Sequence, residues 1–351
     1  MGVEMKSVEA RCVGARKIVG AATRAVATAG VATAAVATAI SLAPFTALAQ
    51  TFPAKPIRIV VPFPPGGVDV TLRSMQPLMQ ADLGQSIVLE NRPGANGYIG
   101  SEIVAKSTPD GYTLLATSSG TMVSGPFITR ETPFDALKDF TPITQFQRTV
   151  SALVVKTSLP VTNMAELITY AKKNPGKLSY GSSGVGSVQH LDAEIIKRAA
   201  GIDMVHVPYK GGGPQGQALV AGEIDVSFHP LQQMRAFITS GKARIVAIYG
   251  PGKRFAGLPN VPDVTETMPD VLTSPSWVGV FGPAGLQQPV LMRLNSALVK
   301  ALTSPEVRPK YEENAVVVAN TPQEFAVAMR ADVEKAGRMV KELKAAGVQL
   351  E

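Results

Sequence analysis

The chain has 351 residues and a formal net charge of +7, with its Lys and Arg residues scattered. Because no block of basic residues stands out, the charge pattern argues against a nucleic-acid-binding surface. Cys12 is the only cysteine, so the chain beyond it forms no disulfide and offers no thiol nucleophile. No set of His, Asp, Glu or Cys residues has the spacing of metal ligands, and we expect no metal or other cofactor.

The first 49 residues have the composition of a secretory signal. Five basic residues lie before Ala25, no charged residue occurs from there to Ala54, and Ala47-Leu48-Ala49 matches a cleavage site. This pattern predicts export with cleavage after Ala49. The uncharged stretch is also long enough to span a bilayer, so a retained membrane anchor is the alternative. Cleavage would remove five basic and two acidic residues and lower the net charge from +7 to +4.

Strand-like and helix-like runs alternate along most of the chain. Strands are predicted at Ile57–Val61, Ile87–Glu90, Tyr112–Ala116, Leu153–Val155, Ser179–Tyr180, Met204–Val207, Ile224–Phe228 and Ile245–Tyr249. Helices are predicted at Asp69–Leu83, Gly97–Lys106, Met164–Lys173, Val188–Ala200, Pro214–Ala221, Leu231–Ser240, Val290–Leu302, Glu306–Asn314 and Gln323–Ala346. Such alternation predicts an α/β fold of mostly parallel sheets flanked by helices.

Two long stretches, Ser118–Gln147 and Gly250–Pro275, show no clear periodicity. Long irregular segments inside a compact chain are usually functional or connect domains. We interpret them as two crossings between lobes, with residues 50–147 and 276–351 in a discontinuous first lobe and 148–275 in the second. Trp277, the only tryptophan, lies beside the second crossing, and we expect it to pack in a core.

Two glycine-rich corners each follow a predicted strand and precede a predicted helix. The first is PFPPGG at residues 62–67, and the second is SSGVGS at residues 182–187. A strand that turns through glycines into a helix directs free backbone N–H groups and the positive helix end at one point. Such a corner binds an anion without a charged side chain. Two corners that face each other across a cleft could hold one small acid, although glycine pairs also serve simply as turn residues.

Side chains near the corners are candidate ligand contacts, and each also has a structural interpretation. Asp69 and Ser187 stand where a helix N-cap is expected, and His190 lies one turn into a helix. Ser118 follows a strand whose carboxyl end should reach the same edge of a sheet. Lys210 is the best placed cation, or else part of the solvated surface. The candidate ligand-binding residues are Phe63, Pro65, Gly66, Gly67, Val68, Asp69, Ser118, Ser119, Thr121, Ser182, Ser183, Gly184, Gly186, Ser187, His190, Tyr209 and Lys210.

Taken together and in order, six short motifs resemble one known family. They are PAKPIR at residues 53–58, PFPPGG at 62–67, ENRPGA at 90–95, PDGYT at 109–113, SSGVGS at 182–187 and HVPYKG at 206–211. With these motifs, residues 52–348 resemble the periplasmic substrate-binding receptors of tripartite tricarboxylate transporters, called Bug or TctC-type receptors.

The resemblance implies a two-lobed receptor with a periplasmic-binding-protein-like fold that closes on a small organic acid. The ligand would lie between Phe63–Asp69 and Ser182–Ser187, and the membrane permease subunits of a tripartite transporter would receive it. It implies a periplasmic location and no enzymatic activity, and we expect a monomer.

One departure from the family pattern concerns the first corner. Family members usually have two residues between the glycine pair and the Asp, often including a Ser or Thr, whereas this chain has only Val68. We therefore expect a ligand with an apolar or aromatic group on that side.

Two other functions remain as alternatives. An enzyme acting on a small acid derivative is the first, although the chain has only three His residues and no G-x-S-x-G, P-loop or H-E-x-x-H motif. The dinucleotide motif G-x-G-x-x-G fails because Gln189 stands at its third glycine position. The second alternative is a receptor whose liganded form docks onto a sensor domain.

Overall fold

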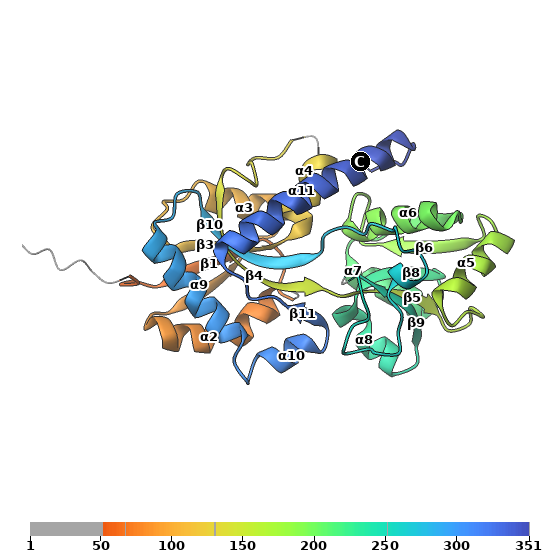
Figure 1. The fold of residues 1–351 in the computed structure, drawn as a ribbon, viewed down its shortest axis with the longest axis horizontal. Coiled ribbons are helices and arrows are strands. Elements are labelled where there is room, and N and C mark those ends of the chain that lie inside the picture. The colour runs from red at the N-terminus through yellow and green to blue at the C-terminus, as the bar shows by residue number, and fades with distance from the viewer. Residues whose placement is uncertain (1–51, 67, 130, 251, 351) are drawn as a thin grey trace, which may run out of the picture. The chain divides into compact units, whose positions relative to one another are not determined.

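The computed structural model describes residues 52–66, 68–129, 131–250 and 252–350, which contain two β-sheets with helices on their faces (Figure 1). The predicted signal and its cleavage site lie outside these residues. We call the part of the chain built on the six-stranded sheet the first lobe, and the part built on the five-stranded sheet the second lobe.

The sheet of the first lobe has the strand order β11-β4-β10-β3-β1-β2. Its strands are β1 (Ile57–Val61), β2 (Ile87–Asn91), β3 (Thr113–Ser118), β4 (Phe140–Thr149), β10 (Trp277–Pro283) and β11 (Ala315–Val317). β1 pairs in parallel with β2 and β3. β10 is antiparallel to β3 and β4, and β11 is antiparallel to β4.

The sheet of the second lobe has the strand order β7-β6-β8-β5-β9. Its strands are β5 (Ser151–Lys156), β6 (Leu178–Ser182), β7 (Met204–Pro208), β8 (Val226–Pro230) and β9 (Ala243–Tyr249). β6 pairs in parallel with β7 and β8, whereas β5 is antiparallel to β8 and β9.

Helices cover both sheets. The first lobe contains α2 (Val68–Leu83), α3 (Tyr98–Ala105), α4 (Gly125–Ile128), α9 (Gln288–Leu302), α10 (Arg308–Glu312) and α11 (Pro322–Ala345). The second contains α5 (Met164–Lys173), α6 (Val188–Ala200), α7 (Gly212–Ala221) and α8 (Leu231–Thr239). Shorter helical turns are η1 (Ala95–Gly97), η2 (Gly120–Ser124) and η3 (Val264–Glu266). Each predicted strand and helix is present, with ends within two residues of the prediction.

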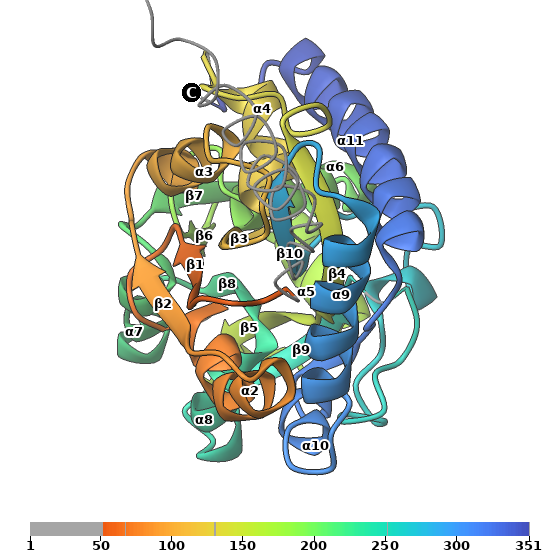
Figure 2. The same cartoon turned by 90° about the vertical axis from the view of Figure 1, so that its left-hand side faces the viewer.

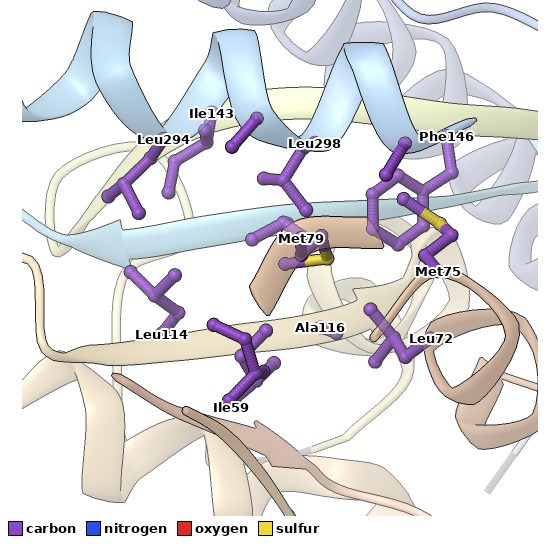
Figure 3. Close-up of a cluster of buried hydrophobic side chains, with 14 of the residues drawn as sticks. Ile59, Leu72, Met75, Met79, Leu114, Ala116, Ile143, Phe146, Leu294 and Leu298 are labelled. Carbon is purple, nitrogen blue, oxygen red and sulfur yellow. The ribbon is translucent and has the colours of Figure 1, made fainter. Parts of the chain in front are cut away.

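Alternate strand residues of the first lobe bury against helices on opposite faces of the sheet. Ile59 belongs to the core formed with α2 and α9, whereas its neighbour Val60 packs with residues of α3 and α11. Figure 2 shows α9 and α11 together with this sheet. In Figure 3, Leu298 of α9 and Met79 of α2 approach each other over the strands. Full burial of one such side chain contributes about 1.5–3 kcal/mol to folding.

The α/β fold with two sheets is as predicted, but the sheets are mixed rather than mostly parallel. Each lobe has three parallel strands whose carboxyl ends share one edge, β2-β1-β3 in the first and β7-β6-β8 in the second. β5 and β10 each enter their sheet from that edge, because they follow a crossing from the other lobe. A strand that begins where its neighbours end must run antiparallel to them.

The first crossing is shorter than predicted. Ser118–Gln147 contains η2, α4 and most of β4, and only Val150 separates β4 from β5. The sequence patterns do not predict β4, β10 or β11, which form the antiparallel half of the first sheet. The sequence does not predict β10 because this strand contains glycines. At Gly279 a Cβ would lie 2.5 Å from the Phe325 ring, so the ring can pack there only against a glycine. Trp277 is buried in a core, as predicted.

Candidate functional site

Both glycine corners lie at the carboxyl ends of parallel strands, the first between β1 and α2 and the second between β6 and α6. Ligands of open α/β sheets collect at this edge. The two lobes meet close to it. A Cβ on Gly120, just after β3, would lie 3.6 Å from Cγ2 of Val188, the first residue of α6. The end of β3 and the start of α6 therefore lie close together across the lobes.

Hydrogen bonds within the second corner fix its conformation. Ser182 Oγ lies 2.6 Å from Nε2 of His206 and accepts a hydrogen bond from Gly184 N (3.2 Å). Gly186 N donates to Nδ1 of His190 (3.1 Å), and Ser187 Oγ accepts from His190 N (3.3 Å), which caps α6. Gly186 has a φ of 72°, in the left-handed region that glycine tolerates.

Three stacked rings, those of Tyr180, His206 and His190, lie next to the second corner. The His190 and His206 rings are 4.0 Å apart and 9° from parallel, and Tyr180 stacks on His206 at 4.8 Å. Burial, and to a smaller extent the neighbouring His190, lower the pKa of His206 to about 4. Burial also lowers the pKa of His190. Both rings are neutral at neutral pH, so His190 can accept from Gly186 at Nδ1 and carry its proton on Nε2.

His190 therefore has a structural role in the corner, which was one of its two predicted interpretations. His206 was not among the predicted site residues, although it lies in the HVPYKG motif. The parallel pairing of β6 with β7 places His206 opposite Tyr180 and beside Ser182. Only knowledge of which strands pair could have linked these residues.

Several backbone N–H groups of the second corner have no hydrogen-bond acceptor in the described part of the chain. The amides of Gly184, Gly186 and Ser187 donate within the corner. The amides of Ser183, Val185, Val188 and Gln189 pair with no acceptor in the described part of the chain. Those of Val188 and Gln189 begin α6 and add the positive end of the helix dipole. Ser183 Oγ donates to Gln189 Oε1 (2.9 Å), so this hydroxyl is already engaged.

A different set of contacts fixes the conformation of the first corner. Phe63 O accepts from Asn91 Nδ2 (2.9 Å), and Gly66 O accepts from Asp69 N (3.0 Å). α2 begins at Val68, so Asp69 lies within its first turn instead of at the N-cap. Asp69 is buried and forms an ion pair with Arg73 Nε (2.8 Å). Gly67 lies outside the described residues, and Pro65 is exposed.

Val68 packs against the core of the first lobe. Val68 is only half-buried, so part of its side chain remains accessible, and the preference for a ligand with an apolar or aromatic group on that side stays a prediction.

Most of the hydroxyl groups at the end of β3 and directly after it form hydrogen bonds within the protein. Ser119 Oγ accepts from Trp277 N (3.1 Å), and Thr121 Oγ1 donates to Asn96 O (2.9 Å). A Cβ on Gly97 would lie 2.8 Å from Thr121 Oγ1 and 3.4 Å from the Phe63 ring, so Phe63 and Thr121 share one small region. Ser118 is half-buried at the same edge.

Tyr209 and Lys210 follow β7 and border the second corner. Tyr209 N donates to Ser182 O (3.0 Å), and Gly211 N donates to Ser183 O (3.2 Å). A Cβ on Gly184 would lie 3.5 Å from Tyr209 O. Lys210 is exposed. The structure therefore assembles the predicted residues of each lobe into one edge, while several of their polar groups serve the fold.

Apolar side chains join the two lobes beside the second corner. This joining cluster consists of Ile128, Leu191, Val340, Leu343 and Leu350. At Gly186 a Cβ would lie 2.7 Å from both Ile128 Cγ2 and Leu350 O. The second corner thus touches α4 and the C-terminal segment of the first lobe directly.

In the described part of the chain, no three His, Cys, Asp or Glu residues are grouped to hold a metal ion. Within the same part, none of the helices is long and apolar enough to cross a membrane.

Two mixed α/β sheets flanked by helices, each with a glycine corner at the carboxyl ends of its parallel strands, are the architecture of the solute-binding protein class. Residues 71–345 match the family model of the tripartite tricarboxylate transporter family receptor, and the chain belongs to this family. It is 34% identical over 301 residues to the UPF0065 protein of the tcbD-tcbE intergenic region of Pseudomonas sp. strain P51, covering 84% of this chain and 88% of that one.

Two solved structures are similar to this chain. Rpa4515 of R. palustris, solved with adipate, has a TM-score of 0.74 and 31% identity over 83% of this chain and 98% of its own. MatC of Rhodopseudomonas palustris, solved with bound malate, has a TM-score of 0.72 and 28% identity over 82% of this chain and all of its own (100%).

Proposed function

We propose that this receptor captures a small carboxylate between its lobes and delivers it to the permease of a tripartite transporter. The observation that carries the proposal is the set of uncommitted amides at the second corner, which includes the first amides of α6. These donors lie where the lobes meet after β3 and favour a negative group without a buried cation. Adipate and malate in the two solved relatives support a carboxylate ligand.

The proposal includes closure of the lobes about Val150 and the 250–276 segment, near which we place the lobe boundaries. We expect saturating ligand to lower the radius of gyration of residues 50–351, and a ligand at 100 times its Kd to stabilise the fold by about 2.7 kcal/mol. A thermal-shift screen of small mono- and dicarboxylates identifies the ligand, and X-ray scattering measures closure. Scattering curves that do not change with a tightly bound acid would contradict a closing receptor.

Export by cleavage after Ala49 is also part of the proposal, because Ala47-Leu48-Ala49 follows an uncharged run. The expected mature chain begins at Gln50. Intact-mass measurement of the protein from a periplasmic extract tests this. A full-length species in the membrane fraction would contradict it.

A hydrolase is the second candidate function. Ser182 Oγ lies 2.6 Å from His206 Nε2, a distance at which a histidine can act as the base that activates a serine nucleophile. However, Ser182 is fully buried, and its Oγ also accepts from Gly184 N. We therefore favour the receptor. Product analysis after incubation with esters of the bound acid separates the two, since a hydrolase would release product and lose this activity on Ser182→Ala.

A further inference from the structure

The segment that follows α11 folds back onto the junction between the lobes. Gly347, with a φ of 80°, turns the chain after the helix. Gly347 N donates to Lys344 O (3.0 Å), and Val348 N donates to Leu343 O (3.1 Å). These two bonds form a Schellman motif, which fixes the direction in which a chain leaves a helix. The turn brings Leu350 into a buried position, where it is 3% exposed.

Leu350 packs in the joining cluster, which contains side chains of both lobes. Val340 and Leu343 of α11 belong to the first lobe, and Leu191 of α6, which is 2% exposed, belongs to the second. Val348 is partly buried against the same cluster. Figure 1 shows α11 reaching from the first lobe towards α6. The segment therefore adds apolar surface to a contact that joins the lobes.

The same segment lies against the second corner. A Cβ on Gly186 would be 2.7 Å from Leu350 O, so the main chain of the segment lies next to the corner. Leu191 N donates to Ser187 O (2.9 Å), which places Leu191 in the first turn of α6. That turn also carries the free amides to which we assign the acid group. Burial of Leu191 in the joining cluster thus holds these amides against the first lobe.

Another contact between the lobes is polar. Arg235 Nε of α8 donates to Asn314 Oδ1 (2.6 Å) of the first lobe. If the lobes separate there, water can replace the lost hydrogen bond, and the net cost is modest. Separation at the joining cluster would instead expose Leu191 and Leu350 to water, which is unfavourable in proportion to the apolar area uncovered. Opening therefore costs more at the joining cluster than at the polar contact.

We propose that residues Gly347–Leu350 are a strap that holds the second corner against the first lobe, with Leu350 as a positioning residue of the binding site. The inference rests on the closing receptor proposed above and adds what stabilises its closed state. With the strap in place, the ligand-free protein already favours the closed arrangement. Apparent affinity for the acid rises with the fraction of molecules in this arrangement.

The test measures the distance between the lobes in ligand-free protein. The chain from Gln50 onward has no cysteine, so spin labels can be attached at Val88→Cys and Val205→Cys. These positions are exposed and lie on β2 and β7, the edge strands farthest from the crossings. Pulsed electron paramagnetic resonance then gives the ratio of short to long distances. Leu350→Ala should lower this ratio about tenfold, and deletion of residues 347–351 at least as much.

Two further variants separate positioning from a general loss of stability. Leu191→Ala removes the partner from the second lobe and should lower the ratio as Leu350→Ala does. Leu302→Ala is the matched control, because this leucine is 0% exposed in the core of the first lobe alone. It should lower the stability of the protein and leave the ratio unchanged.

The outcomes separate the strap from the receptor function. Equal distance distributions for wild type, Leu350→Ala and the deletion, or a shift towards short distances, would overturn the strap. If Leu350→Ala does not fold, Leu350→Val must lower the ratio in smaller measure. Malate or adipate added to wild type should raise the short-distance population. If no small carboxylate does so, the receptor proposal fails, whereas the ligand-free ratios still decide whether the strap holds the lobes together.

Discussion

Gly186→Val should weaken ligand binding by at least about 100-fold, equivalent to ~2.7 kcal/mol. Gly186 has a φ of 72°, and its Cβ would lie 2.7 Å from both Ile128 Cγ2 and Leu350 O in the first lobe. The added side chain would push the second corner away from the first lobe, and it would disturb the amide that donates to His190. Calorimetry with the acid found in the screen measures the loss of affinity, and scattering should show that closure no longer occurs.

Gly222→Val is the matched control for backbone strain. Gly222 has a φ of 81°, ends α7 in the same lobe, and has open space around its Cβ position. Both variants should lose stability by about 1–3 kcal/mol from the left-handed backbone. Only Gly186→Val should lose the ligand. If a folded Gly186→Val protein binds with wild-type affinity, the cleft lies elsewhere. If Gly186→Val does not fold, Gly186→Ala takes its place and should show a smaller loss of ligand affinity.

The stability of the protein should contain a pH-dependent contribution from Asp192. This residue of α6 is 1% exposed, and its Oδ1 accepts from Ser274 N (2.6 Å) in the second crossing. Burial raises its pKa to about 7, although the hydrogen bonds from Ser274 and, to a smaller extent, Lys335 of α11 oppose the shift. Tyr249 and Lys335 are the other titratable groups that interact with it electrostatically.

The raised pKa gives this contribution a definite sign. Between about pH 4 and pH 7 the folded state holds a proton on Asp192 that the unfolded chain has released, so the contribution to the free energy of unfolding falls as pH rises. The loss should be on the order of 3 kcal/mol by pH 8. Asp192→Asn cannot ionise, so its stability relative to wild type should rise across this range.

Denaturant unfolding of both proteins from pH 4.5 to pH 8 measures this difference. Other carboxyl groups titrate in both proteins and cancel in the comparison. Asp203→Asn, at an exposed position of the same lobe, should leave the difference flat. A flat difference for Asp192→Asn as well would mean that this carboxyl ionises in the folded protein as it does in the unfolded chain.

The sequence by itself determined the elements whose signals are local. The alternation of β-branched runs with helical spacing located eight strands and nine helices within two residues of their ends. The two glycine corners were visible because glycine, proline and serine interrupt the periodic pattern at fixed places. Their position between strand and helix was enough to predict a binding edge, since strand direction follows from the βαβ connection.

Only the tertiary structure decided which groups at that edge remain available. β4 and β10 lie inside a sheet, where β4 buries the polar residues Thr144, Gln145 and Gln147 and β10 contains two glycines, so neither has the composition from which a strand is predicted. Ser182 meets His206, and Gly186 meets Leu350, only because strands pair and the C-terminal segment returns to the second corner. Contacts between residues distant in the chain depend on packing, and no local pattern in the sequence records them.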